Sequence, residues 1–263
     1  MTYPHQQKAI DYITNKLKPD PHVHALLLSG SIAHGFNNEK SDIDFNIIVS
    51  NELYEQKKIN NNLTYWESAE GFYNGGYFDG KYITFDYLEM VAKRGNEPTR
   101  FAFQDVMILF DKTGRVMEYI EKIKTYDENR VRNNTIRFLS QFEAWYWYCK
   151  EALEKQNEYL LDVSVSKLIL FSGRLILLEN KMFFPYHKWF ILALENAPKK
   201  PQGFMRTISE LLKHKTKQNI DVLYHAIKEF KNWSNGKNIN WSSHFVHDIE
   251  TIWVRSEEYI ENI

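Results

Sequence analysis

The stretch from residue 26 to residue 50 constrains the fold of this chain more than any other part of it. Two apolar runs, at 25–28 and 45–49, are typical of buried strands bounded by turn residues. The polar connection between them opens with Gly30-Ser31 and closes with Asp42-Ile43-Asp44. We therefore expect two strands whose ends hold a glycine, a hydroxyl and two carboxylates.

Alternation along an extended strand places Asp42 and Asp44 on one side and Ile43 on the other. Two neighbouring carboxylates repel each other unless a cation neutralises them, and hard oxygen ligands suit Mg²⁺ or Mn²⁺. Gly30 lacks a Cβ, so backbone N–H groups can approach a phosphate there, and Ser31 adds a hydroxyl donor. A phosphate cradle facing a carboxylate pair indicates phosphoryl or nucleotidyl transfer.

The same residues resemble the signature of the polymerase β-like nucleotidyltransferases, in which GSxAxG is followed by SDID. The positions that match this signature are Gly30, Ser31, Ala33, Gly35, Ser41, Asp42, Ile43 and Asp44. The resemblance implies that Gly30, Ser31 and Ser41 bind the nucleotide. One departure is His34, where small members of the family often carry arginine.

Two further aspartates, Asp79 and Asp86, lie between residues 72 and 91. Asp79-Gly80, between aromatic and β-branched runs, predicts a hairpin turn, and the strand after it would carry Asp86 among aromatic residues. The family's third metal carboxylate lies on a strand downstream of Asp-x-Asp, and the resemblance therefore assigns Asp86 to this role. Asp86 could also orient or deprotonate the acceptor hydroxyl. The alternatives are an edge-strand Asp86 that faces water, and Asp79 as the ligand.

Composition excludes several classes of protein. The formal net charge of −1 gives no basic footprint for nucleic acid, which disfavours a polynucleotide substrate. A single cysteine, Cys149, can form neither an internal disulfide nor a cysteine-based metal site, which fits a cytoplasmic protein. The first residues lack the apolar core of a secretion signal, and no apolar run approaches the ~20 residues that span a bilayer.

Strand signals stop near residue 116, and long amphipathic helices follow. We therefore predict an α+β protein: a nucleotidyltransferase domain with a mixed sheet over residues 1–116, and an all-α helical bundle over 117–263. Within the bundle, Lys167 and Arg174 lie seven residues apart on an apolar helix and require anionic partners. The resemblance gives Lys167 a contact with the nucleotide triphosphate, and the alternative is a pairing with Glu143, Glu151 or Asp162.

The resemblance implies in-line attack by an acceptor hydroxyl on the α-phosphate of ATP, with Asp42, Asp44 and Asp86 as metal ligands and Mg²⁺ or Mn²⁺ as the cofactor. Glu143, flanked by aromatic residues, is a second candidate for the general base. The expected acceptor is a small hydroxylated molecule. The chain resembles the antibiotic-modifying members of the family, and this resemblance implies an aminoglycoside or a lincosamide. A homodimer is left open. The alternatives are a protein adenylyltransferase of the toxin–antitoxin type and a nucleotide-binding relative without turnover.

Overall fold

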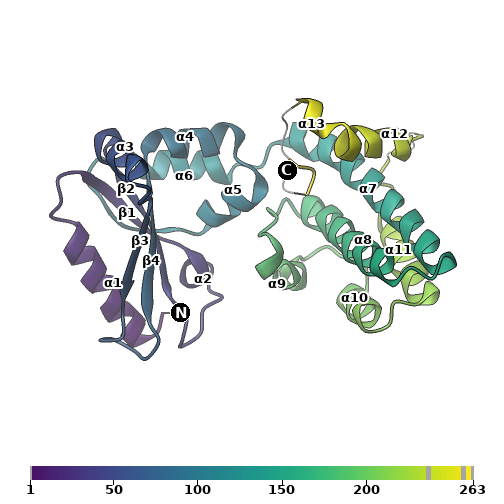
Figure 1. Ribbon diagram of the computed structural model, residues 1–263, viewed down its shortest axis with the longest axis horizontal. Helices are drawn as coiled ribbons and strands as arrows, with labels where there is room; N and C mark the ends of the chain where they lie inside the picture. Colours follow the sequence, from purple (N-terminus) through teal and green to yellow (C-terminus); the bar gives the residue numbers. More distant parts are fainter. Residues whose placement is uncertain (1, 235–237, 256–258, 262–263) are drawn as a thin grey trace. The chain divides into compact units, whose positions relative to one another are not determined.

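The chain divides into two compact units, Met1–Thr125 and Tyr126–Ile263. A computed structural model describes residues 2–234, 238–255 and 259–261 (Figure 1). The boundary after Thr125 lies beyond the predicted one at 116/117, because helix α6 (Val116–Lys124) belongs to the first unit. Its apolar positions Val116, Ile120 and Ile123 are buried in a core that includes residues of the sheet.

The first unit is built on a mixed five-stranded sheet in the order β3-β4-β2-β1-β5. Strand β2 runs parallel to β4, and the other neighbouring pairs are antiparallel. The strands are β1 (Val23–Leu28), β2 (Ile43–Val49), β3 (Thr64–Ser68), β4 (Tyr77–Ile83) and β5 (Met107–Asp111). The two strands predicted from the apolar runs are confirmed as β1 and β2. Nearly every residue of these two strands is buried, which explains why uninterrupted apolar runs were enough to identify them.

Helices cover the two faces of this sheet unequally. The helical spacing of Ala9, Ile10, Ile13 and Leu17 in the sequence predicts a helix that starts at Pro4, and the structure has it as α1 (Pro4–Leu17). Helix α1 packs Ala9, Ile10 and Ile13 against one face of the sheet (Figure 1). On the opposite face, α4 (Phe85–Arg94), α5 (Glu97–Gln104) and α6 pack against the end of β2 and β4 that carries Ile48 and Ile83. The same alternation places Asp44 and Asp79 on this second face, several residues before the part that α4 to α6 cover.

The predicted hairpin at Asp79-Gly80 is wrong, because both residues lie inside the continuous strand β4. The antiparallel partner of β4 is β3, which the sequence analysis did not identify and whose residues alternate between exposed and half-buried. The predicted strand beyond residue 83 is also absent. Strand β4 ends at Ile83, because the next residue, Thr84, begins a helix: its side chain accepts a hydrogen bond from the N–H of Tyr87 and caps α4. Two further helices, α2 (Gly30–Ala33) and α3 (Asn51–Ile59), follow β1 and β2.

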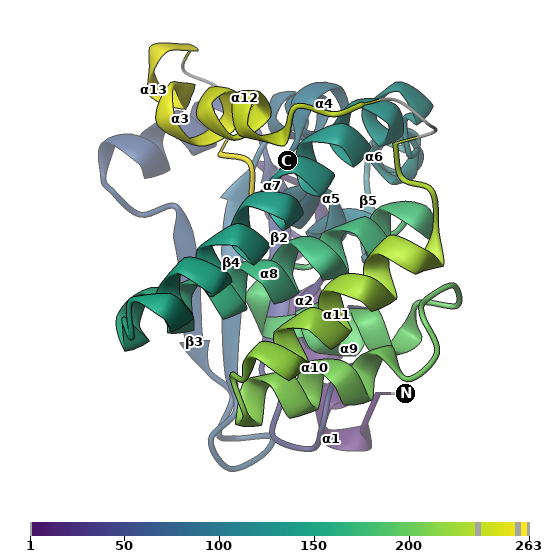
Figure 2. The same ribbon diagram turned by 90° about the vertical axis from the view of Figure 1, so that its right-hand side faces the viewer.

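In the described part of the second unit, helices joined by loops and turns are the only regular secondary structure. Its two longest helices, α7 (Glu128–Glu154) and α8 (Glu158–Glu179), pack along each other, and α10 (Phe204–Lys213) packs along α11 (Lys217–Phe230) (Figure 2). Buried apolar side chains from these helices form one core. The shorter elements are η1 (His187–Trp189), α9 (Phe190–Asn196), α12 (Trp241–Phe245), the π-helical turn η2 (Val246–Glu250) and α13 (Ile252–Arg255).

Helix α8 is apolar on nearly every side, and thirteen of its residues are buried. Gly173 in its middle is required by packing, since a Cβ there would lie 2.3 Å from Cζ of Phe190. Among the described helices, none is both long and apolar enough to cross a membrane.

Candidate nucleotidyltransferase site

The geometry of the Gly-Ser turn is set by Asp44. Gly30 follows β1 with φ of +62°, and a Cβ on it would lie 1.9 Å from Oδ2 of Asp44. The N–H of Ser29 donates to the carbonyl of Asp44 at 2.9 Å, which fixes the turn against β2. Any other residue at position 30 would displace the Asp44 carboxylate as well as adopt an unfavourable backbone conformation.

Ser31 presents an unusual buried hydroxyl. Its side chain is almost fully buried, with 6% exposed, and its Oγ has no hydrogen-bond partner among the described residues. Burying a hydroxyl without a partner costs about 1–3 kcal/mol, so such atoms are rare in folded proteins. A ligand oxygen that accepts from Ser31 would remove this cost.

Four polar residues form a square on the open part of the sheet. Asp44 lies opposite Asp79 in the parallel register of β2 and β4, and the same register places Asp42 beside Tyr77. The Tyr77 hydroxyl is hydrogen-bonded to Asp42. This hydrogen bond, the charge of Asp42, burial and the charges of Asp44 and Asp79 together raise the pKa of Tyr77 to about 12. Three carboxylates thus gather around one phenol.

Asp86 does not belong to this group. It lies in the first turn of α4 rather than on a strand, its side chain is exposed, and its carboxylate accepts a hydrogen bond from Asn51 at 3.1 Å. Asn51 follows the carboxyl end of β2, whereas Asp44 lies near its start. At about 3.3 Å per strand residue, the four residue steps from Asp79 to Ile83 alone separate the two ends by roughly 13 Å. The structure therefore does not bring Asp86 together with Asp42 and Asp44.

The sequence analysis placed Asp79 in a turn, whereas it lies in a strand, and it did not identify Tyr77. Asp79 was assigned to a turn, because Asp-Gly is a strong turn signal, yet Gly80 is needed for packing inside a strand. A Cβ on Gly80 would lie 2.3 Å from Cε2 of Phe45. The aromatic and β-branched residues on both sides of Asp79 were the signal for one continuous strand.

The chemistry of the donor set suits a divalent cation, because carboxylate oxygens are the ligands that Mg²⁺ and Mn²⁺ prefer. As arranged in the described part of the chain, however, no three acidic, histidine or cysteine side chains stand close enough to hold an ion together. Asp42, Asp44 and Asp79 are the carboxylates that would hold one. Tyr77, hydrogen-bonded to Asp42, takes part of the coordination capacity of that carboxylate.

Two other residues of the signature have structural contacts. The Ser41 hydroxyl accepts a hydrogen bond from the N–H of Asn38 at 2.9 Å, and its carbonyl accepts one from the Tyr73 hydroxyl at 2.8 Å. His34 is turned toward Asp105, with 2.8 Å between Nδ1 and Oδ2, and stacks on Phe101. These contacts hold the connection between β1 and β2 in place. The nucleotide role of Ser41 stays a prediction.

The basic residues of the second unit have partners of their own. Lys167 forms an ion pair with Glu261, not with Glu143, Glu151 or Asp162 as the alternative prediction had it. Arg174 is buried, and its guanidinium lies over the rings of two phenylalanines, 4.3 Å from Phe138 and 4.5 Å from Phe184. It also donates to the carbonyl of Glu261. Arg174 is therefore a packing residue of this core.

Glu143, the second candidate for the base, is likewise engaged. Its carboxylate accepts hydrogen bonds from Tyr224 at 2.8 Å and from Lys228 at 2.5 Å, and its side chain is 17% exposed. These contacts join α7 to α11 and give Glu143 a structural function.

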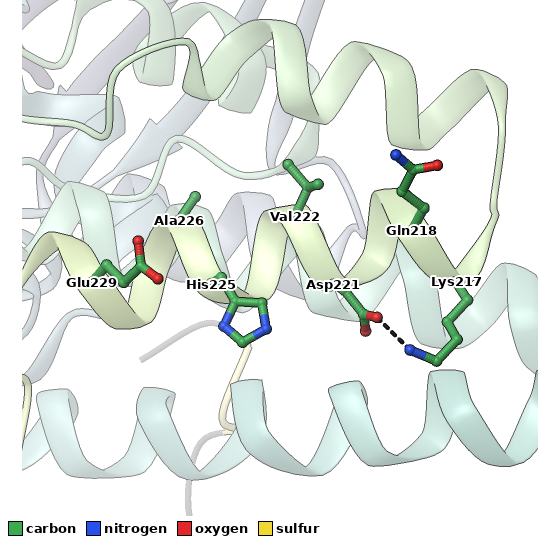
Figure 3. A pocket seen from close by; sticks show the side chains of 7 residues that line it. All are labelled: Lys217, Gln218, Asp221, Val222, His225, Ala226 and Glu229. Carbon is green, nitrogen blue, oxygen red and sulfur yellow. Dashed lines mark hydrogen bonds and ion pairs between the residues drawn. The ribbon is translucent and has the colours of Figure 1, made fainter.

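A shallow groove runs along the outer side of α11, and all the residues that line it come from this one helix (Figure 3). Asp221, His225 and Glu229 form a polar stripe beside the apolar Val222 and Ala226. Asp221 is already held by Lys217 at 2.5 Å and by the Tyr146 hydroxyl at 2.9 Å. The groove thus lacks the convergent groups of a catalytic site.

Two family descriptions match parts of the chain. Residues 11–71 match "Polymerase beta, Nucleotidyltransferase", a segment that includes Gly30, Ser31, Asp42 and Asp44. The first unit thus contains a segment that is similar to the polymerase-beta nucleotidyltransferases. Residues 97–190 match "Domain of unknown function (DUF4037)", which spans the end of the first unit and the first helices of the second. The nucleotidyltransferase match ends before Asp79.

No curated protein matches the chain. Among solved structures, the chain is similar to the crystal structure of a nucleotidyltransferase-like protein from Exiguobacterium sibiricum 255-15. The two share 11% identity with a TM-score of 0.48, and the match covers 95% of this chain and 81% of the other.

Proposed function

We propose that this protein transfers a nucleoside monophosphate, AMP from ATP, to a hydroxyl of a small acceptor. The observation that carries the proposal is the contact between Gly30 and Asp44, which holds a phosphate-accessible turn against a carboxylate. The family match over residues 11–71 supports the same class of chemistry. Neither the family matches nor the similar structure names an antibiotic, so the proposed acceptor class is wider than aminoglycosides.

In the proposed reaction the acceptor oxygen forms a bond to the α-phosphorus of ATP, and the bond from this phosphorus to the bridging oxygen of the β-phosphate breaks. Pyrophosphate leaves, held by the N–H groups of the Gly30 turn and by the Ser31 hydroxyl, whose unpaired Oγ supports this role. The acceptor proton passes to a carboxylate. We assign this function to Asp79, because it lies beside Asp44 on the part of the sheet face that α4 to α6 do not cover.

Asp42, Asp44 and Asp79 are the residues that would hold a divalent cation, which supplies charge neutralisation for the phosphates when it is bound. The carboxylates themselves keep a strongly negative field over this part of the sheet. The phosphates of ATP therefore meet electrostatic repulsion in the absence of a cation, and we expect ATP binding to require added Mg²⁺ or Mn²⁺.

The proposal is tested with the full-length chain, ATP labelled at the α-phosphate, Mg²⁺ or Mn²⁺, and a panel of hydroxylated small molecules and proteins. Release of pyrophosphate together with label on a small molecule supports it. Label on a protein would support the protein-modifying alternative instead. Asp44→Asn should abolish both signals, and unaltered transfer by this variant would refute the site.

The proposed contact between Lys167 and the nucleotide has its own control within the chain. Lys167→Met and Glu261→Gln both remove the same ion pair, so a purely structural lysine predicts equal effects from both variants. A nucleotide contact predicts a higher KM for ATP only in Lys167→Met.

A further inference from the structure

Trp66 is among the most exposed tryptophans of the described chain, with 70% of its surface accessible. It lies on β3, one of the two edge strands of the sheet, and a large aromatic side chain is unusual at such an exposed position. Its location relative to the carboxylates is determined by strand pairing.

The pairing places Trp66 in one row with two carboxylates. Trp66 lies opposite Asp79 in the antiparallel pair of β3 and β4, and Asp79 lies opposite Asp44 in the parallel pair of β4 and β2. Directly paired residues project to the same face of a sheet, so the three side chains share one face. With strands about 4.8 Å apart, the indole starts roughly 10 Å from Asp44 and one strand from Asp79.

The next residue along β3 confirms this assignment of faces. Glu67 lies opposite the buried Phe78 and projects to the other face, where it contacts Lys16 and the Tyr12 hydroxyl of α1. Trp66 must therefore project away from α1, toward the side that carries Asp44 and Asp79.

The in-line geometry of the proposed displacement then indicates which of the two substrates lies near Trp66. In an in-line displacement the acceptor approaches opposite the leaving group. The Gly30 turn, proposed to hold the leaving pyrophosphate, adjoins Asp44 from the β1 side of β2. The acceptor therefore approaches from the other side of Asp44, over β4 and β3, where Asp79 and Trp66 lie.

We infer that Trp66 is a specificity-determining residue that stacks on the ring of a cyclic polyol or sugar acceptor and directs a ring hydroxyl toward Asp79. An indole face packs against the apolar C–H face of such a ring, while the carboxylates beside it accept hydrogen bonds from the hydroxyls on the ring edge. This inference rests on the proposed transfer reaction and names the acceptor class that the same site would take.

The chain offers a matched control. Trp253, in the second unit, is 78% exposed and lies within helix α13. It therefore reports any non-specific stacking of a ring on an accessible indole. The seven tryptophans of the chain can be labelled together with 5-fluorotryptophan, and Trp66→Phe and Trp253→Phe assign the two ¹⁹F resonances.

The experiment titrates the labelled full-length protein, without ATP or metal, with methyl glucoside or myo-inositol as the ring probes and with glycerol as the acyclic control. We expect a saturable shift of the Trp66 resonance with a ring probe, little shift with glycerol, and little shift of Trp253. Equal shifts of both resonances, or no shift of Trp66 with either ring probe, would overturn the inference.

A second measurement separates this inference from the proposed reaction. Pyrophosphate release is followed with ATP, Mg²⁺ and whichever ring probe shifts Trp66. We expect Trp66→Ala to raise the KM for the ring probe about fivefold and to leave the KM for ATP unchanged. An equal rise of both KM values would contradict an acceptor-side role. Absence of release by the wild-type protein with this probe and with every member of the acceptor panel would refute the transfer proposal, whereas the binding titration still decides whether Trp66 recognises rings.

Discussion

Oδ2 of Asp44 occupies the place where a Cβ on Gly30 would project, at 1.9 Å from that position. Two residues of the signature, fourteen positions apart in the chain, are therefore parts of one contact. Each residue constrains the other: only a residue without a Cβ at position 30 leaves room for the Asp44 carboxylate, and this carboxylate fills the space that a side chain at position 30 would need.

Gly30→Ala should reduce the rate of nucleotidyl transfer by about 100-fold. The added methyl group would push the Asp44 carboxylate out of its position, and a small displacement of this carboxylate misplaces the reacting groups. Gly114→Ala is the matched control, since Gly114 has a similar φ of +71° but an added Cβ would meet nothing within 4 Å. Both variants should lose about 1–2 kcal/mol of unfolding free energy in urea from the left-handed backbone conformation. Equal activities of the two variants would contradict the contact.

Asp79→Asn should reduce pyrophosphate release by about 100-fold or more, because it removes a charge beside Asp44 at the proposed acceptor position. Asp86→Asn should keep activity within about twofold and lose about 0.5 kcal/mol of stability, since Asp86 contributes only at the start of α4. The assay compares both variants at saturating ATP. A larger loss in Asp86→Asn would restore the assignment made from sequence.

Cys149 should be inert toward thiol reagents in the native protein at pH 8. Its side chain is fully buried, and burial raises the pKa of the thiol to about 12, so almost no reactive thiolate forms. Since the chain has a single cysteine, the reaction with a chromogenic disulfide reports this site alone. We expect reaction only after unfolding in urea, and a comparable rate in the native state would show that the core of the second unit opens readily.

Asp105→Asn should change how stability depends on acid. The hydrogen bond with His34 lowers the pKa of Asp105 in the folded state. A carboxyl with a lowered folded pKa stabilises the protein above its unfolded pKa of about 3.9 and loses this contribution as the pH falls through its folded pKa. Because the Asp105 side chain is 44% exposed, the contribution is below about 1 kcal/mol.

The measurement is the difference in urea midpoint between wild type and Asp105→Asn from pH 6 to pH 3. Other carboxyl groups titrate in both proteins and largely cancel. We expect the wild type to be more stable at pH 6 and the difference to shrink below pH 4. A constant difference over this range would show that the contact with His34 contributes no stability.

The sequence was sufficient for the parts of the fold that local chemistry determines. The fully buried runs of β1 and β2, helix α1, and the helical second unit were all predicted correctly. The alternation of Asp42 and Asp44 with Ile43 was also correct, because a side-chain period of two leaves one arrangement once a face is buried.

The positions that sequence did not resolve depend on pairing between distant strands. Asp79 and Asp86 are both acidic residues among aromatic neighbours, and only the register of β4 with β2 selects Asp79. The Asp79-Gly80 pair carried a turn signal, but the glycine is present because Phe45 fills the space above it. The partner of Lys167 was equally inaccessible, since Glu261 lies 94 residues away in the sequence.

The contact between Gly30 and Asp44 depends on neighbouring strands, in which Leu28 lies opposite Phe45, and not on the length of the segment that connects them. Insertions or deletions in that segment could be tolerated as long as the strand register survives. A search for distant relatives should accordingly allow a variable gap between the glycine and the aspartate. It should also give weight to a small residue that follows one strand and faces an acidic residue on the adjacent strand.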